Sequence, residues 1–72
     1  MPNAEIYGSY EGAANPAKDL DMFERLKSHA ASAYPLHTVG SSRFEVTHRE
    51  VKGGTVEVHT HYLMLLAPED RP

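Results

Sequence analysis

Two long extended segments, residues 43–51 and 55–67, occupy the last third of the chain, and Lys52-Gly53-Gly54 joins them. Apolar and polar side chains alternate in both segments, and a glycine pair between such segments is typical of an antiparallel β-hairpin. Each strand of a hairpin this long must hide one face from water. The hairpin therefore constrains the possible folds more than any other part of the sequence.

A short strand and one helix are predicted before the hairpin. Residues 4–10 alternate between apolar and polar side chains and predict the strand. Asn15-Pro16 predicts a helix start, because asparagine can cap free amide groups and proline suits the first helical position. Apolar residues then recur at spacings of three and four as far as Tyr34-Pro35, where the helix should end.

The order strand, helix, strand, strand predicts an α+β fold. We expect a β-α-β-β arrangement in a single domain, residues 1–72, with a three-stranded antiparallel sheet and the helix packed on one face. The C-terminal strand should be central. Residues 36–42 form either a loop or the first part of the second strand, and we favour a strand with a bulge at Gly40-Ser41-Ser42. A frayed tail is expected at about residues 68–72.

The register of the hairpin decides which side chains face the helix. A two-residue turn at Gly53-Gly54 would separate Phe44 and Val46 from the apolar residues of the last strand. A three-residue loop at 52–54 or 53–55 shifts the pairing by one residue and gathers one nearly all-apolar face. We therefore predict this loop, with a covered face made of Phe44, Val46, Val56, Val58, Tyr62, Met64 and Leu66. The opposite, outer face would carry Arg43, Glu45, Thr47, Arg49, Val51, Glu57, His59, His61, Leu63 and Leu65.

Size and composition predict self-association. A chain of 72 residues buries only about 60% of the surface that it exposes when unfolded. Because there is no cysteine, neither disulfides nor thiolate metal sites can add stability. One helix covers only one side of a sheet, so a homo-oligomer is the expected way to shelter the other side.

Charge and hydropathy argue against several classes of partner. The net charge is −3, and this balance argues against duplex nucleic acid. No segment approaches the roughly 20 apolar residues that cross a bilayer, and the first residues do not resemble a signal peptide. We therefore expect a cytoplasmic protein with no membrane partner.

His59 and His61 lie two residues apart in the last strand, with Glu57 in line, so all three should share one face. Two imidazoles and a carboxylate are ligand types used by zinc and iron sites, which makes a divalent metal the alternative to a protein without cofactors. Histidines across an oligomer interface would instead repel one another on protonation and form a pH sensor. A polar strand face without either role is the simplest interpretation.

No catalytic motif accompanies the hairpin, and we expect a protein that is not an enzyme. If Met1 were removed, the amine of Pro2 could act as a base, as in the small tautomerases. Those enzymes begin with a longer apolar strand directly at the proline, whereas Asn3-Ala4-Glu5 follows here. Ser41 and Ser42 lack the strand-turn-helix frame of a nucleophilic serine, and the glycines form no phosphate-binding loop.

The layout of one strand, one helix and a long hairpin resembles that of the dodecins, which are small flavin-storing oligomers. Phe44-Glu45-Val46 falls where the second strand of a dodecin begins. Arg43 occupies the place of the aromatic residue that stacks on flavin, and the chain has no tryptophan. The resemblance therefore does not carry the flavin over and assigns no family.

The sequence favours a small, non-enzymatic, self-associating protein whose activity is binding. The expected partner is another protein, as for an inhibitor or accessory factor, bound by the outer face of the hairpin. The residues predicted to bind this partner are Arg43, Arg49, His59, His61, Tyr62 and Leu63. The alternative is an oligomer that binds a small molecule or a metal through His59 and His61 or through a pocket between subunits.

Overall fold

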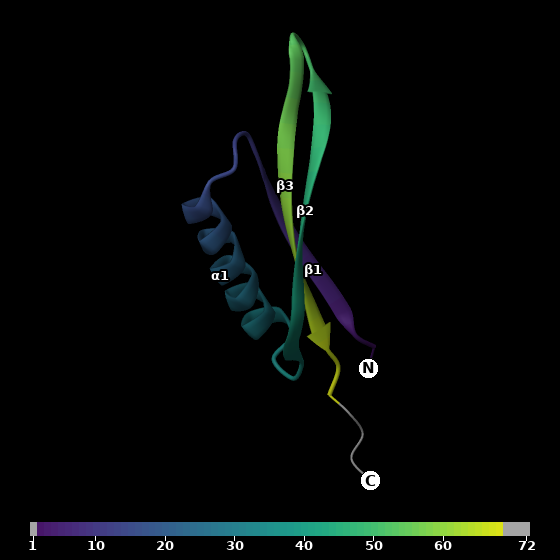
Figure 1. Ribbon diagram of the computed structural model, residues 1–72. Helices are drawn as coiled ribbons and strands as arrows, with labels where there is room; N and C mark the ends of the chain where they lie inside the picture. The colour runs from purple at the N-terminus through teal and green to yellow at the C-terminus, as the bar shows by residue number, and fades with distance from the viewer. Residues whose placement is uncertain (1, 69–72) are drawn as a thin grey trace.

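The computed structural model describes residues 2–68 and contains one helix and three strands. They follow in the order β1 (Ala4–Glu11), α1 (Pro16–Ala33), β2 (Thr38–Val51) and β3 (Gly54–Leu66), as Figure 1 shows. The predicted α+β order is therefore confirmed. Most of the expected frayed tail lies outside the described residues.

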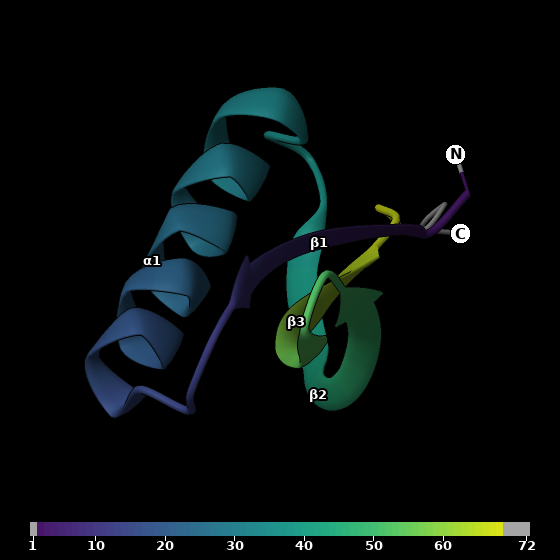
Figure 2. The ribbon, with the colours of Figure 1, turned by 90° about the horizontal axis from the view of Figure 1, so that it is seen from above.

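The three strands form one antiparallel sheet with the order β1-β3-β2, so the C-terminal strand is central as predicted. Helix α1 lies on one face of this sheet (Figure 2). Its packing is against β1 and β3, the two strands that carry the core residues of the sheet. The opposite side of the sheet, called the open face below, has no helix over it.

Local sequence signals set the ends of the helix. The side chain of Asn15 accepts hydrogen bonds from the backbone N–H groups of Ala17 and Lys18 at 3.0 and 3.2 Å. Pro16 occupies the first turn, where its missing N–H costs nothing. At the other end, the N–H of Tyr34 still donates to the carbonyl of Ala30, and Pro35 then prevents another turn.

The predicted bulge in β2 is confirmed. Val39 pairs with Leu65 and Ser42 pairs with Leu63, so two residues of β2 lie opposite one residue of β3. A Cβ atom at Gly40 would lie 3.1 Å from the side chain of Leu66, and glycine suits this close approach. Because of the bulge, β2 begins at Thr38 rather than after residue 42.

The predicted register of the hairpin is wrong. Val51 pairs with Gly54, so the connection is a two-residue turn at Lys52-Gly53. The φ angle of Gly53 is 90°, close to the value that a type II turn requires at its second central position. This register brings Phe44 opposite His61 and Val46 opposite His59.

The two sheet faces are consequently exchanged along β3. The side chains on the helix side are Glu57, His59, His61, Leu63 and Leu65, which the predicted register places on the outer face. Those on the open face are Val56, Val58, Thr60, Tyr62, Met64 and Leu66. Strand β1 decides the exchange, because Ile6 pairs with Leu63 and Ala4 with Leu65, and both β1 side chains pack on the core.

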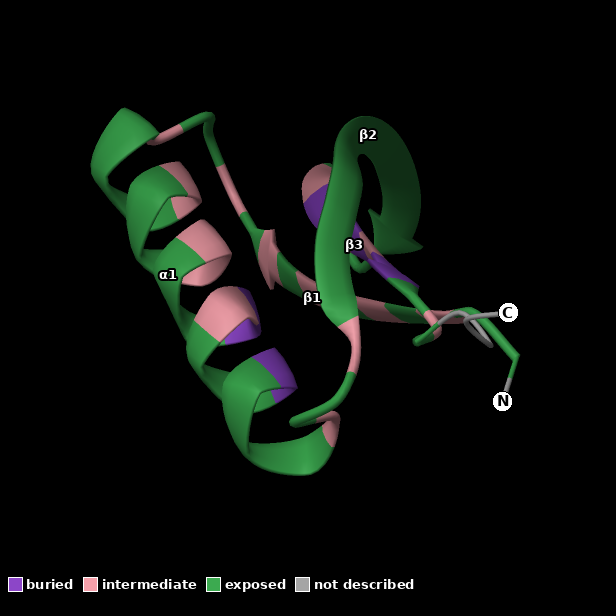
Figure 3. Cartoon of the chain, turned by 90° about the horizontal axis from the view of Figure 1, so that it is seen from below, coloured by how far each residue is buried: buried purple, intermediate pink, exposed green. Residues whose placement is uncertain are grey.

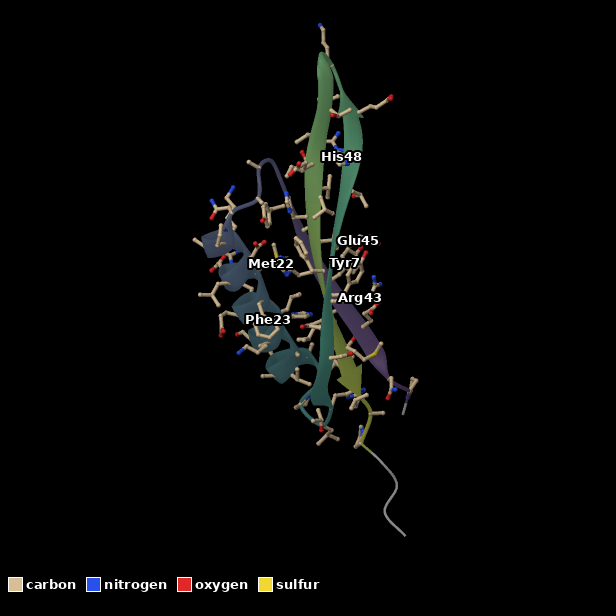
Figure 4. The ribbon with its side chains drawn as sticks, in the orientation of Figure 1. Tyr7, Met22, Phe23, Arg43, Glu45 and His48 are labelled. Atoms are coloured by element: carbon tan, nitrogen blue, oxygen red, sulfur yellow. The ribbon has the colours of Figure 1, made fainter. Side chains whose placement is uncertain are left out.

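The hydrophobic core is small and lies between α1 and β3. Its buried members are Leu26, Ala30, Leu63 and Leu65, and the two leucines of β3 are fully buried. Met22 and Phe23 add to it from the sheet-facing side of the helix, as Figure 4 shows. Gly8 lets the helix approach β1, since a Cβ atom there would lie 2.5 Å from the sulfur of Met22.

Strand β2 is exposed along its whole length, as the continuous green of Figure 3 shows. The distal part of the hairpin also projects beyond β1 and the helix (Figure 1), because β1 pairs with β3 only as far as Val58. The apolar side chains of β2 therefore remain in water: Val39, Phe44, Val46 and Val51 are each at least 39% exposed.

The exchanged register makes Leu63 a core residue, and Leu63→Ala tests this. Leu63 is 0% exposed, so we expect the substitution to lower the free energy of unfolding by about 2–5 kcal/mol. Leu20→Ala is the matched control, because Leu20 is 63% exposed on the helix. Urea unfolding followed by circular dichroism measures both. Equal effects of the two substitutions would contradict the register.

Candidate functional site

The residues predicted to bind a partner divide between the two faces of the sheet. Arg43, Arg49 and Tyr62 lie on the open face. His59, His61 and Leu63 lie on the helix side and not on the predicted outer face, because the observed register differs from the predicted one. The structure thus contains two groups of polar and aromatic side chains, one on each face.

The group on the helix side, called the histidine cluster below, consists of Tyr10, Asp19, Glu57, His59 and His61. At its centre is the carboxylate of Asp19, in the first turn of α1. Its Oδ1 atom accepts a hydrogen bond from the Tyr10 hydroxyl at 2.5 Å and lies 2.9 Å from Nε2 of His61. Since a carboxylate only accepts, Nε2 of His61 donates. Asp19 thereby ties the start of the helix to both β1 and β3.

These bonds shift the acidities of the cluster. The hydrogen bonds from Tyr10 and His61 hold the pKa of Asp19 below its usual value, although partial burial opposes them. Burial and the bond to Asp19 raise the pKa of Tyr10. The cluster therefore keeps Asp19 ionised and Tyr10 protonated at neutral pH. With both donors bound to it, Asp19 serves as a structural tether.

His59 is buried, with 2% of its surface exposed, and its ring is stacked between two aromatic rings. Tyr10 lies parallel to it at 4.8 Å between centroids, and Phe44 lies at 5.9 Å. Its Nε2 atom is 3.0 Å from the carbonyl oxygen of Gly12 and 3.1 Å from Glu57. Both neighbours are acceptors, so Nε2 carries the proton.

The other ring nitrogen of His59, Nδ1, is buried without a hydrogen-bond partner among residues 2–68. In the neutral ring this atom is an acceptor, and leaving a buried acceptor unpaired is unfavourable. Phe44 lies beside this region, half exposed, with its ring 4.6 Å from that of His61. The border of the histidine cluster toward β2 therefore combines a buried, unpaired nitrogen with an apolar ring that is half exposed.

The alternative of a metal held by His59, His61 and Glu57 finds no assembled ligand set. The three residues share the helix side, but Nε2 of His59 is bonded to Glu57 and Gly12, while Nε2 of His61 faces Asp19. Among residues 2–68, no group of three or more histidine, aspartate or glutamate side chains is arranged to hold a metal ion.

The group on the open face is a row of charges and aromatic rings across all three strands. The guanidinium of Arg43 lies 3.7 Å from the centroid of the Tyr62 ring and 3.5 Å from the carboxylate of Glu5. The ring of Tyr7 lies 5.9 Å from that of Tyr62, and the Tyr62 hydroxyl donates to Glu45 at 3.4 Å. Figure 4 shows Tyr7, Arg43 and Glu45 on the side of the sheet away from the helix.

A second ion pair lies farther along the same face. Arg49 of β2 bonds both carboxylate oxygens of Glu11 in β1, at 2.7 to 3.0 Å, across the central strand. These hydrogen bonds raise the pKa of Arg49. Both side chains remain about half exposed, so the pair fixes the arrangement of the strands more than it adds stability.

Sequence reasoning missed Asp19 and Tyr10 as members of the histidine cluster. Asp19 is 42 residues from His61, and only the packing of the helix on the sheet brings them together. A signal for Tyr10 did exist, because the alternation of β1 places Tyr10 on the same face as Ile6. Pro2, considered as a tautomerase-like base, lies before β1, and its carbonyl is 3.2 Å from the His37 ring.

Comparison with protein-family models, curated proteins and solved structures gave no significant match. The topological resemblance to the dodecins therefore gains no support from these comparisons. Within residues 2–68, the helix is not apolar enough to cross a membrane.

The lowered pKa of Asp19 predicts how stability depends on pH. A carboxyl whose pKa is depressed on folding stabilises the protein above its usual pKa, near 3.8, and this stabilisation is lost as the pH falls through the folded value. We expect Asp19→Asn to lower the urea midpoint at pH 7, and the difference from the unsubstituted protein to shrink below about pH 4.

Asp21→Asn is the matched control, since Asp21 forms only an exposed pair with Arg25 in the same helix. We expect it to change the urea midpoint little at either pH. If the urea midpoint of Asp19→Asn stays below that of the unsubstituted protein by the same amount from pH 7 to pH 3, the proposed stabilisation by ionised Asp19 is contradicted.

Proposed function

We propose that this protein is a small self-associating binding protein without enzymatic activity, and that its assembly buries strand β2. The observation that carries the proposal is the exposure of β2 from Thr38 to Val51 on both faces. Large apolar side chains left in water over a contiguous surface are typical of interaction sites. A cytoplasmic location is part of the proposal.

The surface area supports self-association. A compact monomer of 8.0 kDa is expected to expose about 4,450 Å², whereas this chain exposes 5283 Å². The excess of about 830 Å² is close to the area that one partner contributes to a standard protein interface. The radius of gyration, 14.9 Å, also exceeds the roughly 11 Å expected of a compact domain of this length.

The open face is the surface that we propose for a further protein partner. Arg43, Arg49 and Tyr62 remain in this role, joined by Tyr7, which is 69% exposed. Arginine and tyrosine are enriched at sites that dominate binding energy. His59, His61 and Leu63 are left out because the helix covers them.

Substitution of Val46 tests self-association. We expect the unsubstituted protein to have a mass in solution that is a multiple of 8.0 kDa, and Val46→Lys to weaken its association at least tenfold, because a charge would enter the buried apolar surface. Native mass spectrometry and light scattering at micromolar concentration measure both. Circular dichroism checks that the variant folds.

Leu20→Lys is the matched control, since Leu20 is exposed on the helix and lies away from β2. We expect it to leave the mass unchanged. An unsubstituted protein that is monomeric at every concentration tested, and remains stable, would contradict the proposal.

A second candidate function is a small-molecule-binding oligomer whose pocket lies between subunits. The observation that favours it is the unpaired Nδ1 atom of His59 beside the half-exposed ring of Phe44. Because this nitrogen is buried, a ligand with a hydrogen-bond donor would have to open the border in order to complete both the polar and the apolar contact. Native mass spectrometry separates the two functions, because a retained ligand or metal adds mass to each subunit.

A further inference from the structure

We propose that two copies of the chain pair antiparallel through their β2 edges, in a register centred on Thr47. This inference rests on the proposed self-association and names its contact. Strand β2 is one of the two edges of the sheet, so its outward backbone N–H and C=O groups have no strand partner in the subunit. An unpaired edge is a template for strand addition.

The geometry of an antiparallel edge contact limits the possible registers. Two copies related by a two-fold axis can extend the sheet antiparallel only if the axis is perpendicular to the sheet. One residue then lies opposite its own copy, and each residue faces a partner residue with its side chain on the same face. The register is therefore defined by the residue at the centre.

The charges of β2 decide between these centres. A centre at Glu45 places that carboxylate opposite its own copy, and a centre at Arg49 does the same with two guanidinium groups. A centre at Val46 places Arg43 opposite Arg49 twice. Like charges directly opposite each other oppose pairing, so these three registers are unfavourable.

A centre at Thr47 gives the opposite result. Glu45 then lies opposite Arg49 of the second copy, twice by symmetry, and Thr47 lies opposite Thr47. Threonine pairs and opposite charges are favourable cross-strand neighbours. Glu45 forms no ion pair among residues 2–68. Arg49 bonds Glu11 across the central strand within the subunit, so its half-exposed guanidinium must turn toward the β2 edge to reach Glu45 of the second copy.

The length of the contact also favours this centre. The bulge between Val39 and Ser42 ends the regular part of β2, which leaves residues 42–51 for pairing. A centre at Thr47 uses residues 43–51 of both copies. Centres at Phe44 or His48 avoid charge clashes but pair fewer residues before the bulge or the turn is reached.

The resulting dimer has a continuous six-stranded sheet with both helices on the same side. The exposed Val46 of each copy comes to lie beside the imidazole of His48 of the other. On the open face, the row of charges and aromatic rings continues from one copy into the next through the Glu45–Arg49 pairs. The contact thus covers part of the β2 surface that the subunit leaves in water.

A charge-exchange experiment tests this register. In a dimer of the Glu45→Arg variant, an arginine faces an arginine at both contacts between positions 45 and 49. In a dimer of the Arg49→Glu variant, a glutamate faces a glutamate at the same contacts. We therefore expect each variant alone to associate at least tenfold more weakly than the unsubstituted protein. Mixed in equal amounts, the two variants form opposite-charge pairs at both sites, and we expect association within about threefold of the unsubstituted protein. To avoid repulsion from Glu11 within the subunit, the second variant also carries Glu11→Gln, and Glu11→Gln alone is the control.

A cysteine placed at the centre provides an independent measurement. The chain has no cysteine, and Thr47→Cys would place two cysteine Cβ atoms directly opposite each other, roughly 4.5–5.5 Å apart. A small approach of the two strands then reaches the Cβ separation of about 3.5–4.5 Å that a disulfide needs. Under a mild copper–phenanthroline oxidation we expect Thr47→Cys to form a covalent dimer and Val51→Cys to remain uncoupled.

The outcomes separate this proposal from the proposed function. An oligomer in which Thr47→Cys does not couple, or in which mixing the charge variants restores nothing, overturns the β2 register while self-association stands. An unsubstituted protein that is monomeric overturns both. Coupling of Thr47→Cys together with recovery on mixing supports both.

Discussion

One helix covers two strands of a three-stranded sheet, and most features of this protein follow from that constraint. Helix α1 packs against β1 and β3, and it leaves the longest strand, β2, exposed along its whole length. Within residues 2–68, the buried apolar residues are few, namely Leu26, Ala30, Leu63 and Leu65. A core of this size gives a chain of 72 residues little stability by itself. The exposed strand and the small core therefore both favour association with another chain.

The position of the helix depends on polar contacts as well as on the core. Asp19 accepts from Tyr10 of β1 and from His61 of β3, so one carboxylate joins the first turn of the helix to two strands. Buried polar groups are tolerated when such bonds satisfy them. Among residues 2–68, the Nδ1 atoms of His37 and His59 are exceptions, because each is buried without a partner. The border between His59 and Phe44 therefore contains one of the two buried, unsatisfied side-chain nitrogens of the described residues.

The sequence predicted the order of the elements, the asparagine cap, the central place of the last strand and the bulge in β2. Each of these depends on local signals such as Asn15-Pro16 or Gly40. The register could not be obtained in the same way, because gathering the apolar residues of the hairpin on one face favours a three-residue loop, whereas the observed register leaves apolar residues on both faces. What decides it is that Ile6 and Leu63 face the helix together. The histidines can then lie on the helix side because Asp19, Glu57 and the Gly12 carbonyl accept hydrogen bonds from their ring N–H groups. Two of these acceptors, Asp19 and Gly12, come from distant parts of the chain.

The bond between Tyr10 and Asp19 has a consequence for how the chain reaches its folded state. The two residues are only nine positions apart, whereas pairing of β1 with β3 joins residues as distant as Ala4 and Leu65. Closing a short loop costs less chain entropy than closing a long one. The first strand and the start of the helix can therefore meet early, as a local unit stabilised by this bond. The hairpin, itself a local unit, can then pack on the surface that β1 and the helix have already formed. Its outer strand, β2, stays exposed in the folded subunit and is buried only when a second chain binds.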